Sequence, residues 1–176
     1  AIGPTYNNLK YTAKDARDFA MAVSQKVNMN FFERIYVDTL VTPETTTTND
    51  IRRVFESIKN RFYEQDRIDR IDKNDYLMVF ISGHGLNYNG QFRFLPTDFD
   101  YNYVETTSIN YERDIIEFLN QIECKKIAFI DACLSGTIEG GKGTSGEKLS
   151  NALLLANESA PGTAAFASCS DNEQSY

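Results

Sequence analysis

Two residues that can do nucleophilic chemistry each follow an apolar run of the sequence. His84, the only histidine, stands in "VFISGHG" (79–85), and Cys133 stands in "FIDACLSG" (129–136). We expect each apolar run to form a buried strand that ends just before its reactive residue. Because ligands bind outside the carboxyl ends of strands in open α/β sheets, the imidazole and the thiol should meet at one sheet edge.

An imidazole beside a thiol is the arrangement that thiol-based nucleophilic catalysis requires. A thiolate at Cys133 would attack a carbonyl carbon, and His84 would generate the thiolate and then protonate the leaving amine. The backbone N–H groups of Gly85 and Cys133 are candidate donors to the oxyanion, because a glycine lets the backbone approach a substrate closely. The alternative is a structural histidine and a thiol that only fills space.

The other two cysteines, Cys124 and Cys169, are interpreted as small buried apolar residues. Three cysteines without a C-x-x-C pair or neighbouring histidines argue against a disulfide framework and against a zinc site. We therefore expect no metal, and reduced thiols in a cytoplasmic protein.

Composition narrows the class of protein. The chain has 176 residues, of which 41% are hydrophobic and 24% charged, which is ordinary for one globular domain. A net charge of −7 argues against a nucleic-acid partner and fits a basic peptide or protein substrate. Since no apolar run approaches about 18 residues, we expect no membrane span.

Helical periodicity predicts three helices. The first covers residues 12–28, where Thr12 and Asp15 resemble a capping box. The polar loop 42–50 should end in the cap of the second. The apolar positions of the second and third helices are Ile51, Val54, Phe55, Ile58 and Phe62, and then Ile115, Ile116, Leu119 and Ile122.

Strand patterns alternate with these helices. We predict strands at residues 32–37, 76–82, 126–131 and 163–169, a small hairpin within 86–108 and a charged connector at 64–75. A short helix is expected at 151–158. Alternating strands and helices with short connections predict one α/β domain with a mostly parallel sheet and helices on both faces.

One further motif comes close to a nucleotide-binding loop. The segment "GTIEGGKG" (136–143) nearly matches G-x-x-x-x-G-K-[ST] and follows a predicted strand. Gly143 stands where a serine or threonine must hold magnesium, so we reject a nucleotidase.

Several segments together resemble the caspase-like cysteine peptidases, in the metacaspase and bacterial orthocaspase branch. The resemblance rests on "FISGHG" followed by "FIDACLSG", with the cysteine 49 positions after the histidine. Supporting matches are "AIG" at the start, "LKYTAKDARDFA" (9–20), "FRFLPTDFD" (92–100) and "TAAFASCSDNEQSY" (163–176). It implies a three-layer caspase–hemoglobinase sandwich with His84 and Cys133 as the catalytic dyad.

The same resemblance implies a specificity pocket. In metacaspases an acidic S1 pocket selects Arg or Lys, and its acids match Asp131 and Asp15 here. The glutamine that caspases carry at the position of Asp131 is absent, which argues against cleavage after aspartate. For each acid a structural reading stays open: Asp131 as the cap of a turn or helix, and Asp15 as a first-turn carboxylate.

The resemblance also predicts the organisation of the chain. Residues 1–136 are similar to a large subunit, 137–150 to a flexible linker and 151–176 to the start of a small subunit, in a single domain that is incomplete at both ends. The rest of the domain or a small-subunit chain is therefore an expected partner. Lys142 and Lys148 in the linker suit self-processing by a basic-selective site.

Many metacaspases need calcium, which acidic residues bind. Asp98, Asp100 and Glu105 are present, but Thr106-Thr107 replaces a further pair of acids, so we expect no cofactor. We predict a cysteine endopeptidase that cleaves after Arg or Lys. The alternative is a catalytically inactive caspase-like module used for protein interaction.

Overall fold

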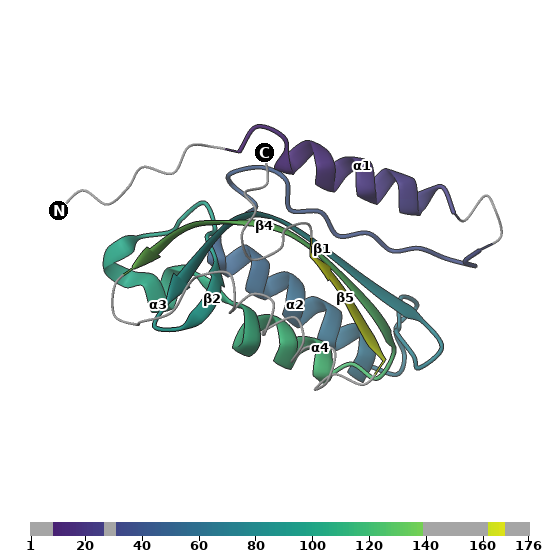
Figure 1. The fold of residues 1–176 in the computed structure, drawn as a ribbon. Coiled ribbons are helices and arrows are strands. Elements are labelled where there is room, and N and C mark those ends of the chain that lie inside the picture. Colours follow the sequence, from purple (N-terminus) through teal and green to yellow (C-terminus); the bar gives the residue numbers. More distant parts are fainter. Residues whose placement is uncertain (1–8, 27–30, 139–161, 168–176) are drawn as a thin grey trace.

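The fold is a five-stranded mixed sheet with helices on both faces. The computed structural model describes residues 9–26, 31–138 and 162–167. Its strands lie in the order β3-β2-β1-β4-β5. Helix α1 covers one face, and α2 and α4 cover the other (Figure 1). The predicted α/β sandwich is confirmed.

The three strands that matter for chemistry are parallel. β1 (Tyr76–Tyr88) pairs with β4 (Lys125–Ile138), and β4 pairs with β5 (Thr163–Ala167). β2 (Gln91–Phe94) and β3 (Ile109–Asn110) extend the sheet antiparallel beyond β1. The predicted strands at 76–82, 126–131 and 163–169 are confirmed as elements, although 168–169 lie outside the described residues.

The predicted ends of β1 and β4 are wrong. Both strands continue past the glycines and past Cys133, to Tyr88 and Ile138. The turn comes later, at Asn89 and Gly90, whose φ angles of 50° and 81° suit a two-residue hairpin. Neither Gly83 nor Gly85 has a positive φ, so a G-x-G sequence here remains extended backbone. The hairpin predicted within 86–108 is confirmed as the β1–β2 connection.

The helices bury one side of the sheet. α2 (Thr48–Tyr63) begins as predicted, with Thr47 Oγ1 accepting a hydrogen bond of 3.2 Å from the Asp50 N–H. The third predicted helix is a π-helical turn (Tyr111–Ile116) that continues into α4 (Glu117–Asn120). Its predicted apolar face is the core, since Ile115, Ile116, Leu119 and Ile122 are all buried. A 3₁₀ turn (Tyr101–Tyr103) and α3 (Val104–Thr107) precede it.

Two expectations near the N-terminus fail. α1 (Thr12–Ser24) is shorter than predicted, and it begins after Tyr11 without a side-chain cap, so the capping box is wrong. Residues 32–37 form no strand. Within the described ranges this segment has no ladder partner. Tyr36 Oη instead donates a hydrogen bond of 3.1 Å to the Ile68 carbonyl in the 64–75 connector. The helix predicted at 151–158 lies outside the described residues.

The two faces of the sheet are packed to different depths. Ala128, Ile130 and Ala132 of β4 are buried against α2 and α4. On the opposite face α1 has no buried residue. The apolar run of β1 is therefore central in the sheet, as predicted, but its side chains are only half-buried.

Candidate active site

Register brings the two predicted reactive positions together. In the parallel ladder of β1 and β4, His84 is the Cα partner of Cys133, and Ser82 is the partner of Asp131. Because successive residues of a strand alternate between faces, positions 82 and 84 lie on the same face as Phe80. Phe80 faces α1, since its ring stacks on Phe19 at 5.0 Å. The site therefore lies under α1.

Asp131 is held by a residue that the sequence did not single out. Ser82 Oγ donates a hydrogen bond of 3.4 Å to Oδ2 of Asp131, and both side chains are half-buried. The signal was present in the sequence, because Ser82 lies two positions before His84 and so shares its face. A hydrogen bond that links the two strands favours a positioned carboxylate over a cap for Asp131.

His84 belongs to the middle of a strand rather than to a turn. Its carbonyl accepts a hydrogen bond of 3.0 Å from the Leu95 N–H, which ties β1 to the end of β2. The imidazole-bearing residue is half-buried, and Gly85 beside it is buried. The backbone of Cys133 lies in β4, and its side chain lies outside what the structure describes.

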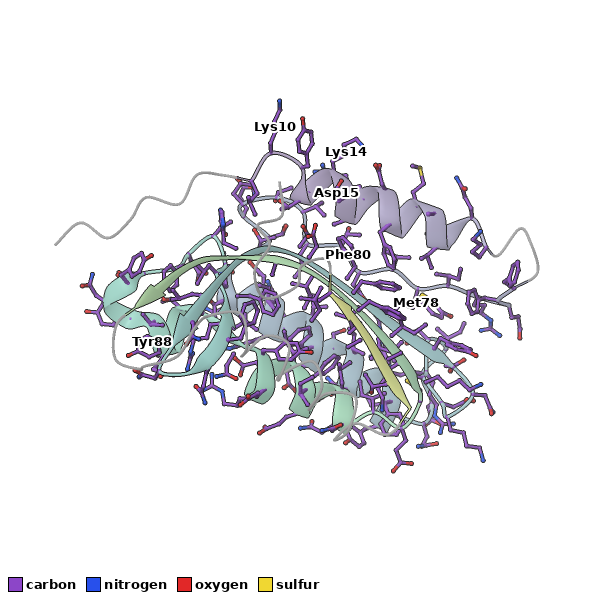
Figure 2. The ribbon with its side chains drawn as sticks, viewed as in Figure 1. Lys10, Lys14, Asp15, Met78, Phe80 and Tyr88 are labelled. Carbon is purple, nitrogen blue, oxygen red and sulfur yellow. The ribbon has the colours of Figure 1, made fainter. Side chains whose placement is uncertain are left out.

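Asp15 comes from the helix above this face. Asp15 is a half-buried residue in the first turn of α1. In Figure 2 it lies on the side of the helix that is turned toward Phe80. The structure thus gathers Asp15, Ser82, His84 and Asp131 on one side of the sheet. Lys142, Lys148 and Cys169 lie outside the described residues.

Cys124 matches its predicted structural role. Its side chain is buried, without a disulfide. Burial raises the pKa of this thiol, and the positive charge of Lys126 only partly opposes that effect. Cys124 is therefore a weak nucleophile at neutral pH.

The acids that a calcium site would need have other partners. Asp98 Oδ1 accepts a hydrogen bond of 2.8 Å from the Thr48 N–H at the start of α2. Asp100 caps the 3₁₀ turn, and Glu105 forms an ion pair with Arg93. No group of three or more candidate ligand residues is found in the described parts of the chain. Each of these three carboxylates thus has a protein partner, and the absence of a calcium requirement stays a prediction.

Comparison with known proteins identifies the family of this chain. The family model of the caspase domain matches residues 2–176, which is almost the whole chain. No curated protein and no solved structure matched it. Among the described helices, none is both long and apolar enough to cross a bilayer. With a parallel β1–β4 pair that aligns a histidine and a cysteine, and a family match along its length, the chain belongs to the caspase-domain family of cysteine peptidases.

Proposed function

We propose that this protein is a cysteine endopeptidase that cleaves peptide bonds after Arg or Lys. The observation that carries the proposal is the pairing of His84 with Cys133 in adjacent parallel strands. Aligned partners in neighbouring strands have Cα atoms only about 5 Å apart, which is within reach of an imidazole and a thiol. Each lies four residues after an aromatic residue of the same face, Phe80 in β1 and Phe129 in β4.

The reaction divides into two steps. The Cys133 thiolate attacks the scissile carbonyl carbon, and His84 donates its proton to the leaving amine as the C–N bond breaks, which leaves an acyl-enzyme. Water then attacks the thioester and His84 takes its proton. The C–S bond breaks, which releases the acid product and regenerates the Cys133 thiolate beside protonated His84. Backbone N–H groups of Gly85 and Cys133 are the proposed donors to the oxyanion of each tetrahedral intermediate.

The proposed S1 pocket contains two carboxylates. Asp131 lies on the sheet two residues before the nucleophile, and Asp15 lies on the helix that covers this face. A basic side chain between them would pair with both, as in the metacaspase branch. Ser82 keeps the Asp131 carboxylate oriented through its hydrogen bond. We propose a cytoplasmic enzyme that needs no cofactor and matures by cleavage after Lys142 or Lys148.

The test uses substrates and a covalent probe together. We expect fluorogenic peptides ending in Arg or Lys to be cleaved, and an Arg-chloromethylketone to modify Cys133 in a mass spectrum. Cys133→Ala and His84→Ala should each lose peptide hydrolysis by a factor of about 10³ or more. If the wild type cleaves none of these peptides and the probe leaves Cys133 unmodified, the chain is an interaction module instead.

A further inference from the structure

Phe19 is an aromatic side chain through which α1 contacts the sheet. Its ring stacks on Phe80 of β1 with centroids 5.0 Å apart and 19° between planes. It also contacts Phe129 of β4 at 5.1 Å. Phe129 in turn stacks on Phe166 of β5 at 5.5 Å. Phe80, Phe129 and Phe166 are partners in the ladders, so Phe19 lies on a row of rings that crosses three strands.

Helix α1 packs shallowly on the sheet, with its apolar residues Ala16, Phe19, Ala20 and Val23 half-buried. None of its residues is buried. Among the described contacts, a hydrogen bond of 3.2 Å from Arg17 Nη2 to the Val41 carbonyl is the polar link between α1 and a distant segment. Arg17 reaches a loop rather than the sheet, whereas the ring contacts of Phe19 with Phe80 and Phe129 tie α1 to two strands.

The spacing of residues then places Asp15. From Asp15 to Phe19 is one helical turn of four residues, a rise of about 6 Å. From the Phe80–Phe129 row to the Ser82–Asp131 row is two strand residues, about 6.6 Å. α1 extends from Asp15 toward the Met78 end of β1, so helix and strand run in opposite directions (Figure 2). With Phe19 on its row, Asp15 therefore comes to lie over the row that contains Asp131.

We infer that Phe19 is a positioning residue for substrate specificity, because it sets Asp15 opposite Asp131. The inference rests on the proposed function and adds the reason why two acids from distant segments act on one substrate side chain. A guanidinium donates in a planar fork and can pair with a carboxylate on either side, whereas an ammonium is a point charge. The proposed pocket should therefore prefer Arg to Lys, and the preference should depend on Phe19.

The experiment compares Phe19→Ala with Asp15→Asn and with the double variant. We expect Phe19→Ala to raise KM for an Arg peptide about tenfold while kcat stays within about twofold of wild type. The ratio of kcat/KM for the Arg peptide to kcat/KM for the matching Lys peptide should fall. In the Asp15→Asn background the same change should have little further effect, because both act through one carboxylate. Phe19→Tyr, which keeps the ring, should restore KM. Met21→Ala, an exposed residue of the same helix, is the matched control and should leave KM unchanged.

A binding measurement separates this inference from the catalytic proposal. Agmatine, a small guanidinium compound, is titrated into Cys133→Ala protein with and without Phe19→Ala, and NMR shifts give Kd. Weaker agmatine binding on loss of Phe19 supports the inference even if no variant hydrolyses peptides, an outcome that would refute only the catalysis. Additive effects of Phe19→Ala and Asp15→Asn, or equal agmatine affinity in both proteins, would overturn it. Phe19→Leu replaces Phe19→Ala if the alanine variant does not fold.

Discussion

The hydroxyl of Ser82 donates a hydrogen bond to Oδ2 of Asp131 across the β1–β4 pair, at 3.4 Å. The two residues are 49 positions apart in the chain, and each precedes a proposed catalytic residue by two positions. One strand pair thus supplies both the proposed dyad and a supported carboxylate. Substitutions in β1 and β4 should therefore distinguish residues that affect substrate binding from residues that affect the reactivity of the Cys133 thiol.

Ser82→Ala should weaken basic substrates without disabling the thiol. A long hydrogen bond to a charged acceptor contributes on the order of 1 kcal/mol, which corresponds to about a fivefold rise in KM for an Arg peptide. The rate at which iodoacetamide alkylates Cys133 should stay within about twofold of wild type. A fall in alkylation as large as the fall in kcat/KM would show that Ser82 acts on the dyad instead.

Asp131→Ala should weaken basic substrates more than Ser82→Ala does. Removing one partner of a desolvated charge pair costs about 2–5 kcal/mol, so kcat/KM for Arg and Lys peptides should fall by a factor of about 30 or more. For peptides that end in an uncharged residue, kcat/KM should fall far less. The acidic S1 pocket is wrong if the wild type hydrolyses an Asp-terminated peptide faster than an Arg-terminated one.

The cysteines should differ in reactivity. Since burial raises the pKa of Cys124, iodoacetamide at pH 7.5 should label Cys133 in the native protein and label Cys124 only after denaturation. Peptide mapping by mass spectrometry measures both sites in one sample. Cys124→Ala serves as the control and should keep full peptidase activity; rapid native labelling of Cys124 would contradict its buried position.

Acid should destabilise the fold partly through Asp114. Burial acts to raise the pKa of this carboxyl, but hydrogen bonds from Arg113 and the Asn110 N–H, with the charge of Arg52, lower it below its usual value. A pKa lowered on folding adds stability above the unfolded value of about 3.9, and that stability is lost as the pH falls through the folded pKa. Asp114→Asn should therefore lower Tm at pH 7 by a few degrees and flatten the decline of Tm below about pH 5. An unchanged acid profile in calorimetry would contradict this role.

The two faces of the sheet should respond differently to loss of an aromatic ring. Phe118 is 4% exposed and stacks on Phe55 at 4.5 Å, so Phe118→Ala should cost about 3–5 kcal/mol of unfolding free energy. Phe166 is 56% exposed, and Phe166→Ala should cost on the order of 1 kcal/mol. Urea unfolding measures both losses of free energy, provided that the dependence of the unfolding free energy on urea concentration is the same in wild type and variants. Equal losses would mean that the α1 face is as well packed as the opposite one.

The sequence predicted elements better than their ends or partners. The apolar faces of α2 and of residues 115–122 follow directly from helical periodicity, because burial on one side produces that pattern. The continuation of β1 to Tyr88 was missed, since glycine is compatible with both a turn and a strand and pairing with β2 and β4 decides between them. The failure at 32–37 has the same cause: an alternating pattern does not guarantee a ladder partner.

The residues proposed for the candidate site come from motifs and from the family resemblance, whereas the contacts that support these residues do not. The two strand motifs pointed to His84 and Cys133, and the resemblance to metacaspases added Asp131. The hydrogen bond from Ser82 depends on the register between two distant segments, and the stack of Phe19 on Phe80 depends on how α1 docks on the sheet. Both are tertiary relations, which local patterns do not encode.

The alternation of faces along β1 and β4 also limits which lengths evolution can change. Phe80, Ser82 and His84 share a face only because their positions in the chain differ by even numbers. Inserting or deleting one residue between Phe80 and His84 would turn the imidazole into the core against α2 and α4. Homologous sequences should therefore tolerate insertions freely in the connector at 64–75, while the spacings 80–84 and 129–133 should stay constant in length even where the residue types drift.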